Sequence, residues 1–456
     1  MLEKARSLVE DALRRQDARY IEVRLEETES AHISYRGRDL EEIGRSTGIG
    51  GCVRALAGGG WGFVCFNSLD GLRDKVSAAI SNARLVAGDK VELAPAGPVV
   101  DVVKPVIKKD PREVPLADKK AQLDQYVDVI WGVPNIASST VGYADRSRKV
   151  VFASSQGTYV EQQKLDVIFR ASAMARDGSD VQQSHISIGS NGDYALVEGL
   201  HDSVKSMACR SYELLKAPHA RGGEYTVVLD PVLAGVFIHE AFGHLSEADH
   251  VYENQQLRDI MVLGRKFGGK HLNVVDGALV PGLRGSFKYD DEGIPATKTY
   301  LLKEGQLVGR LHSRETAARM GETPTGNARA ISHDFPPIVR MTNTYIENGT
   351  ATFNDLIADV KEGVYACNWF GGMTSMEQFT FSAGEAYMIR NGKVAELVRP
   401  VMLTGNLFVT MENLDAVAND LAMNEGGGCG KGGQSPLAVS NGSPHIRIQK
   451  CLVSGR

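Results

Sequence analysis

The sequence predicts an α+β protein of two domains, and three observations lead to this fold class. The chain has 456 residues, which is more than one hydrophobic core usually serves. Segments with apolar residues at helical spacing occur among runs in which apolar and polar residues alternate. Residues 216–223, with a proline and two adjacent glycines, interrupt both patterns. We therefore expect a helix-flanked antiparallel sheet in residues 1–220 and a β-rich domain in residues 221–456.

In the first domain, helical spacing of apolar residues predicts four helices, at residues 1–20, 69–86, 116–133 and 195–215. Asn67 and Ser68 are candidate caps for the second of these helices. Alternation predicts strands at residues 20–27, 32–35, 40–45, 48–57, 61–66, 140–145, 149–153, 164–174 and 184–188. Three glycines at residues 58–60 join two of these strands into a hairpin.

The second domain begins with a buried strand, residues 225–229, and with a helix that starts at Asp230 and Pro231. Proline suits the first turn of a helix, where its missing N–H costs nothing. Short strands follow, with further helices at residues 313–320 and 355–362.

Composition and charge exclude several classes of protein. Hydrophobic residues make up 43% of the chain and charged residues 23%, as in ordinary globular proteins. The net charge is -5 and no dense block of Lys and Arg occurs, so we expect no nucleic-acid partner. Charges throughout the first segment exclude a signal-peptide core, and no apolar run approaches the roughly 18 residues of a membrane span. We expect a cytoplasmic protein without a membrane partner.

The chemistry is concentrated at the end of the helix that begins at Asp230, where His239 and His244 flank Glu240. Neutral imidazoles bind zinc, and a catalytic zinc uses three protein ligands and carries a water whose pKa falls to about 7. Glu240 could take a proton from that water and later give it to a leaving amine. The motif indicates a zinc hydrolase with Glu240 as the base, provided that a third ligand exists.

The spacing of the two histidines differs from that of the helical zinc motif HExxH. They are five residues apart, so a regular helix would separate them by about 140° around its axis. A single wide π-turn absorbs one extra residue, and Gly243 has no Cβ to clash there. We therefore predict a locally unwound helix at residues 241–244. The alternative is a helix that His239 ends and His244 caps, without a metal.

Cys429 is the candidate for the third ligand. It lies in a run of glycines at residues 426–433, where backbone segments can approach closely, and zinc favours a thiolate partner. The other five cysteines lack CxxC spacing, and most of them are expected to be small buried side chains. Glu247 is a rival ligand, although we favour a hydrogen bond in which Glu247 accepts from an imidazole N–H and so orients the ring. The glycine run lacks the spacing of a phosphate-binding loop.

Several other residues, including one tryptophan of the first half, receive no role in the site. Asp290, Asp291 and Glu292 could bind calcium, but three adjacent carboxylates before a glycine favour a solvated turn. The remaining histidines of the second half have no ligand spacing, and the two tryptophans that could line a groove are more typical of a core: His250, His271, His312, His333 and His445, and Trp61 and Trp369.

The chain resembles the TldD/PmbA metallopeptidases, a family once labelled modulators of DNA gyrase. The resemblance is specific across the second half and looser in the first, where GIGGCVRALAGGGWGF at 48–63 carries it. The histidine motif is that of the TldD branch, since the PmbA branch lacks these ligands. The matching motifs of the second half are HEAFGHLSEAD at 239–249, DDEGIP at 290–295, MGETPTGNAR at 320–329, MTNTY at 341–345, FGG at 370–372, SAGEAYMIRNGKV at 382–394 and CGKGGQS at 429–435.

The resemblance implies a zinc ion (Zn2+) held by His239, His244 and Cys429, with Glu240 as the catalytic base. It also implies a peptidase that acts on unfolded or flexible polypeptides, including the trimming of leader peptides. The family forms dimers, so we expect either a homodimer or a heterodimer with a PmbA-type relative. Two other functions stay open: a non-catalytic regulator that binds a partner protein, and a thiol enzyme in which Lys431 is the cation beside Cys429.

Two further expectations concern access and substrate binding. The first domain has no chemical motif, so we expect it to provide shape, dimer contacts and control of access to the site. We expect an extended peptide to bind by adding as a strand to an exposed sheet edge of the β-rich second domain, near the motif helix.

Overall fold

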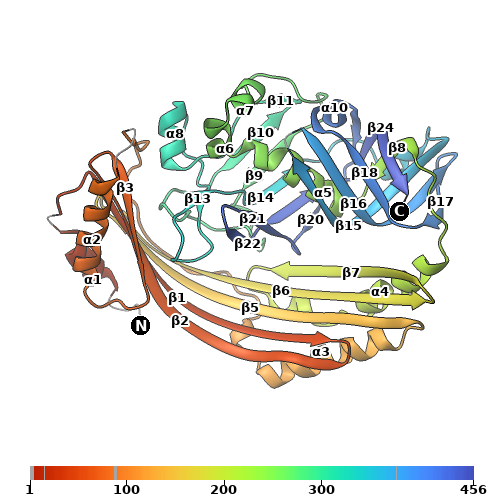
Figure 1. Ribbon diagram of the computed structural model, residues 1–456, viewed down its shortest axis with the longest axis horizontal. Coiled ribbons are helices and arrows are strands. Elements are labelled where there is room, and N and C mark those ends of the chain that lie inside the picture. Colours follow the sequence, from red (N-terminus) through yellow and green to blue (C-terminus); the bar gives the residue numbers. More distant parts are fainter. Residues whose placement is uncertain (1–4, 15, 87–89, 376, 456) are drawn as a thin grey trace.

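The computed structural model describes residues 5–14, 16–86, 90–375 and 377–455, and within them the predicted α+β fold is confirmed. The first half forms one long, curved sheet (Figure 1). The more compact, β-rich second half lies on the concave side of this sheet, and the helices of the first half lie on its other side.

The sheet of the first half has the strand order β3-β2-β1-β5-β6-β4, and β7 also pairs with β6. As predicted, its pairs are antiparallel, except that the short β4 runs parallel to β6. Its elements are β1 (Tyr20–Arg36), β2 (Asp39–Ala57), β3 (Gly60–Phe66), β4 (Val100–Val103), β5 (Ile136–Ser154), β6 (Tyr159–Asp177) and β7 (Asp180–Ser190), with helices α1 (Ala5–Leu13), α2 (Leu72–Leu85), α3 (Leu116–Trp131) and α4 (His201–Lys216).

Four strands are much longer than the alternation predicts. β1 has 17 residues, and β2, β5 and β6 have 19 each, so the predicted breaks within β1, β2 and β5 are wrong and the strand predicted within β6 is too short. β1 pairs with β2 on one side and with β5 on the other along almost its whole length. Backbone pairing on both sides continues the strand through polar stretches that a local pattern assigns to turns.

The two faces of this sheet bury different kinds of side chain. On β1, Ile21, Val23 and Leu25 pack in an apolar cluster with residues of α1 and α2. Glu22 and Arg24 point to the opposite face, as alternation requires, yet they are only 4% and 2% exposed. The predicted half-buried strand is therefore buried on both faces, because the second half covers the polar one.

The second half contains a seven-stranded sheet, a six-stranded sheet and two short two-stranded sheets in the described residues. Its core is one large apolar cluster, which the helix α5 joins. Its strands are β8 (Gly223–Leu229), β9 (Val274–Gly277), β10 (Lys298–Lys303), β11 (Gln306–Leu307), β12 (Ala328–Arg329), β13 (Ile338–Val339), β14 (Asn343–Ile346), β15 (Glu362–Ser375), β16 (Gln378–Arg390), β17 (Lys393–Val398), β18 (Val401–Asn406), β19 (Leu414–Val417), β20 (Ala422–Asn424), β21 (Gly428–Lys431), β22 (Gln434–Ala438), β23 (Ser440–Ser443) and β24 (Ile446–Gly455).

Its helices are α5 (Pro231–Ile238), α6 (Ala248–Glu253), α7 (Gln255–Ile260), α8 (Arg314–Met320), α9 (Phe353–Ile357) and α10 (Leu407–Glu412). No helix in the described part of the chain combines the length and the apolarity that a membrane crossing requires.

The positions of the helices are predicted more accurately than the lengths of the strands, although the ends of several helices differ from the prediction. The first helix is shorter than predicted, and residues 1–4 and 15 of that prediction lie outside the described residues. The cap of α2 is Gly71 in a left-handed conformation, so the proposed caps are wrong. α4 begins at His201 after a separate 3₁₀ turn, and α9 ends early because β15 takes over at Glu362.

Ion pairs connect the two halves, and the acidic turn predicted to be solvated is part of this interface. Asp290, Asp291 and Glu292 are 4–5% exposed, so that prediction is wrong. Asp290 accepts hydrogen bonds from three backbone N–H groups. Glu292 accepts from Arg54 of the first half at 2.8 Å, and Asp291 lies 3.9 Å from the Arg148 guanidinium. Buried carboxylates require such partners, and for Asp291 and Glu292 the other half supplies them.

Candidate metal centre

The helix α5 and the turn that follows it position the histidine motif. The Asp230 side chain caps the helix by accepting the Leu233 N–H at 2.8 Å, as the sequence predicts for this start. The helix then widens into one π-helical turn, His239–Gly243, and tightens into a 3₁₀ turn at His244–Ser246. The predicted wide turn is thus confirmed, although it begins two residues earlier than expected.

Gly243 is required by packing rather than by backbone conformation. Its φ of -58° and ψ of -53° are ordinary right-handed values. A Cβ at this position would lie 2.1 Å from the Sδ of Met341. The absence of a side chain lets the turn approach Met341, and the wide turn brings the rings of His239 and His244 to 5.4 Å between centroids.

The structure brings Cys429 to the two histidines. One side-chain atom from each of the three residues lies within 4.8 Å of the others, and the Cys429 Sγ is 3.4 Å from the His244 Nε2. Cys429 lies on β21, in a hairpin with β22. Buried Arg340 supports this hairpin by donating to the carbonyls of Cys429 and Gln434 at 2.7 and 3.2 Å. The sequence did not single out Arg340, since nothing local marks an arginine as fully buried.

The environment of Cys429 favours the thiolate. Burial raises the pKa of this thiol, but hydrogen bonds and charges from His239 and His244 outweigh burial and lower the pKa to about 5. A thiolate and two imidazoles are donors that zinc prefers. The His239 Nδ1 is buried and has no hydrogen-bond partner among the described residues. A buried polar atom without a partner is unusual, and a metal ion would provide one.

Glu247 acts on His244, as predicted, and is not one of the three converging ligands. Its Oε2 accepts from the His244 Nδ1 at 2.9 Å and lies 3.2 Å from the Lys431 Nζ. Burial raises the Glu247 pKa, but His244 and Lys431 together lower it to about 2. Lys431 also donates to Asp249 at 2.6 Å. Lys431 therefore neutralises these carboxylates, and its contacts do not support the role of cation for the thiol.

Glu240 lies beside the cluster and faces a large cavity. Its side chain is 32% exposed, and its Oε2 is 3.9 Å from the His244 Nε2. The cavity has a volume of about 700 Å³, and both His239 and Glu240 line it. Cys429 is 2% exposed and does not line this cavity. The cluster is therefore approached from the side of His239 and Glu240.

The first half supplies the opposite wall of the cavity. Residues 185–188 of β7 line it, together with Thr140 of β5 and Arg170 of β6. No sequence motif indicates this wall, because the side chains come from strands distant from the histidine motif in the chain. Trp369 also lines the cavity, whereas Trp61 donates to Glu315 at the interface between the halves.

The histidines without an assigned role lie outside the three-residue cluster. Each has another polar neighbour, at 2.7 to 3.8 Å, among the described residues: His250, His271, His312, His333 and His445. The six cysteines are free thiols. The α+β fold and the converging imidazoles and thiol, with a carboxylate beside them, define a candidate metal-binding protein of the hydrolytic class.

Comparison with known proteins identifies the family. Three sequence profiles match the chain: PmbA/TldA metallopeptidase domain 1 at residues 21–83, the central domain at 109–212 and the C-terminal domain at 222–455. The chain belongs to the PmbA/TldD metallopeptidase family. The first two profiles cover segments that contribute strands to the same sheet of the structure.

The names and the folds of individual relatives are consistent with membership of this family. A protein named metalloprotease from Synechocystis sp. is 48% identical over 440 residues, which cover 96% of this chain and 95% of the relative. A protein named zinc metalloprotease TldD homolog from Saccharolobus solfataricus is 33% identical over 325 residues, covering 71% of this chain and 72% of the relative. The crystal structure of TldE from Thermococcus kodakarensis shares the fold, with a TM-score of 0.76 and 16% identity over the whole of both chains.

Proposed function

We propose that the protein is a TldD-type, zinc-dependent peptidase in which His239, His244 and Cys429 hold the ion and Glu240 is the catalytic base. The observation that carries this proposal is the convergence of three ligand atoms within 4.8 Å beside a large cavity. The donor set fits zinc, because three protein ligands are what a catalytic zinc site uses.

Zinc, when bound, polarises the substrate carbonyl and activates a water. The protein's own side chains supply the remaining steps. Glu240 accepts the proton of the attacking water at a carboxylate oxygen and returns it to the leaving amine. Glu247 accepts the hydrogen bond of the His244 Nδ1–H, which leaves the His244 Nε2 lone pair directed at the cluster. The cavity has room for several residues of an extended peptide.

The strand β7 is the sheet edge best placed to bind an extended substrate. In the described residues it pairs only with β6, and four consecutive residues, 185–188, line the cavity. Main-chain pairing with such an edge tolerates many side chains, as expected for a peptidase of flexible polypeptides and leader peptides. The sequence suggested an edge in the second domain, whereas β7 belongs to the first.

Cleavage assays on a compact substrate protein and on its denatured form test this proposal against the alternative of a non-catalytic regulator. We expect cleavage of the reduced, unfolded form only, because a folded chain cannot enter the cavity as a strand. A chelator should abolish cleavage, and one equivalent of zinc should restore it, as measured by mass spectrometry of the products. Binding without cleavage at full zinc occupancy would favour the regulator, and equal cleavage of both forms would contradict the substrate class.

We further propose that residues 1–220 and 221–456 are two structural units, of which the first restricts access to the site. The apolar clusters support this division, since each draws its residues from one half, apart from Ala220 at the boundary, which packs in the large cluster of the second half. We also propose a cytoplasmic location, because all six cysteines are free thiols, as is usual in a reducing compartment. An intracellular peptidase gains selectivity when its site is enclosed.

The same proposal includes a dimer, either of two copies of this chain or with a PmbA-type relative. Light scattering of the purified chain should give about twice its 49.3 kDa mass. A monomer that becomes a 1:1 complex on addition of a PmbA-type relative would select the heterodimer. A monomer that stays monomeric with such a relative, and cleaves with full selectivity, would contradict the dimer.

A further inference from the structure

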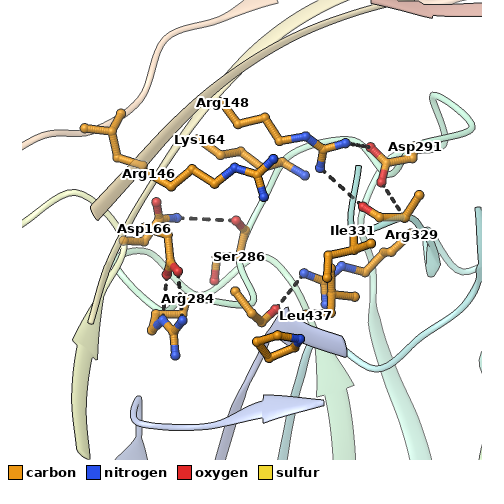
Figure 2. Close-up of a pocket in the computed structure, with 15 residues that line it drawn as sticks. Arg146, Arg148, Lys164, Asp166, Arg284, Ser286, Asp291, Arg329, Ile331 and Leu437 are labelled. Atoms are coloured by element: carbon orange, nitrogen blue, oxygen red, sulfur yellow. Dashed lines mark hydrogen bonds and ion pairs between the residues drawn. The ribbon is translucent and has the colours of Figure 1, made fainter. Parts of the chain in front are cut away.

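A second, smaller cavity lies between the two halves, away from the histidine motif. Its volume is about 110 Å³, and it is lined by β5 and β6 on one side and by segments near β12 and β22 on the other (Figure 2). Cationic side chains outnumber carboxylates in its lining. The charged residues are Arg146, Arg148, Lys164, Arg284 and Arg329 against Asp166 and Asp291.

Two of the five cations are neutralised by carboxylates. Arg284 and Asp166 form a two-pronged pair, with distances of 2.6 and 2.8 Å. Arg148 donates to Glu26 and lies 3.9 Å from Asp291. Figure 2 shows both pairs at the edges of the cavity. Both carboxylates that line the cavity, Asp166 and Asp291, therefore already have an arginine partner.

The other three cations have no carboxylate partner at ion-pair distance among the described residues. Figure 2 shows the Arg146 and Lys164 nitrogens directed into the cavity without a hydrogen bond to its other lining residues. Lys164 instead lies 4.3 Å from the centroid of the Phe287 ring. Arg329 donates only to the carbonyls of Met341 and Ala438, at 2.6 and 2.7 Å.

Arg329 is buried and Arg146 and Lys164 are half-buried, so this excess of positive charge is partly removed from water and is costly. Burial lowers the pKa of Lys164 to about 8, and the attraction of Asp291 offsets the effect only in part. Burial, followed by repulsion from neighbouring Arg340, lowers the pKa of Arg329 to about 10. Charges that are removed from water are usually paired, and the protein does not supply partners for these.

We propose that this cavity binds a small tetrahedral oxyanion of the phosphate or sulfate class, contacted by Arg146, Lys164 and Arg329. Three unpaired cations more than offset the two negative charges of a dianion. A volume of about 110 Å³ is several times what one ordered water needs, so the cavity has room for a small tetrahedral ion. The ion links the first sheet, which carries Arg146 and Lys164, to Arg329 of the second half. It therefore stabilises the interface on which the wall of the larger cavity depends.

Calorimetric titration of the full-length protein with sulfate, at constant ionic strength against chloride, tests this inference. We expect one equivalent to bind and the Tm to rise with sulfate concentration. The double substitution Arg146→Gln and Lys164→Met should weaken sulfate binding by at least about tenfold, since each removes a charge-assisted contact. In chloride the variant should melt no lower than the unmodified protein, because repulsion between cations is relieved. Lys205→Gln, which removes an exposed cation of α4 that lines neither cavity, is the matched control and should leave sulfate binding unchanged.

Inorganic phosphate and glycerol phosphate distinguish the source of the oxyanion. Binding of inorganic phosphate alone indicates a free ion, and equal binding of both indicates the phosphoryl group of a larger molecule. Sulfate and phosphate that act no more strongly than chloride would overturn the proposal. So would a sulfate affinity that the double substitution leaves unchanged.

Discussion

Replacement of Glu240 by glutamine is expected to leave the metal content and the fold unchanged while turnover falls by about 10²- to 10⁴-fold, the usual contribution of a general base. The amide can still donate or accept a hydrogen bond beside the cluster, but it cannot take a proton from water. Its side chain is 32% exposed, and its contact with His244 is a long one at 3.9 Å, so the substitution should not unfold the site. Cleavage rates and metal analysis of the same preparation check both parts.

A matched substitution, Glu253→Gln at the end of α6, removes a carboxylate from a nearby helix outside the cavity lining. It should leave turnover unchanged. Near-normal activity of Glu240→Gln would remove Glu240 as the base. Loss of metal in that variant would instead assign Glu240 a role in holding the ion.

Replacement of Cys429 by alanine is expected to abolish stoichiometric zinc binding and, with it, peptidase activity. Removal of a residue that only orients a ligand costs about 10- to 100-fold in affinity, so the loss of a direct ligand should cost at least as much. The alanine leaves two imidazoles, which hold zinc poorly at neutral pH. Metal analysis after gel filtration, followed by zinc titration with a competing chelator, measures the effect.

Cys451→Ala is the control, since Cys451 is also buried but is remote from the histidines. Burial raises the pKa of Cys451 to about 12, whereas the histidines lower that of Cys429 to about 5. One full equivalent of zinc in Cys429→Ala would exclude the thiolate as a ligand, and Glu247 would become the next candidate. The thiol-enzyme alternative predicts activity that survives complete removal of zinc from the unmodified protein.

Much of the candidate site follows from local sequence. The five-residue spacing of His239 and His244 requires a wide turn, because no regular helix brings the two rings together, and a π-helical turn is present. Asp230 and Ser313 cap the helices that they precede, since capping involves residues only three apart. The pairing of Glu247 with His244 also spans three residues.

The third ligand depends on the fold. Cys429 lies 185 positions from His244, and its glycine-rich surroundings made it a candidate without fixing its distance to the motif. The resemblance to a family supplied that assignment. The structure adds the means of positioning, which are the β21–β22 hairpin and the buried guanidinium of Arg340 beneath it.

The sequence by itself determined the α+β class, the places of most helices, the wide turn and the residues that could bind a metal, because each depends on neighbours along the chain. Only the tertiary structure decided where strands end, what covers their polar faces and which side chains line the cavities. Arg54 meets Glu292 across 238 residues, and residues 20–26 of β1 are buried on both faces because the second half lies against them. An alternating pattern of apolar and polar residues indicates that the two faces of a strand differ in polarity. Whether water or another part of the chain covers the polar face depends on contacts that form only when distant segments pack together.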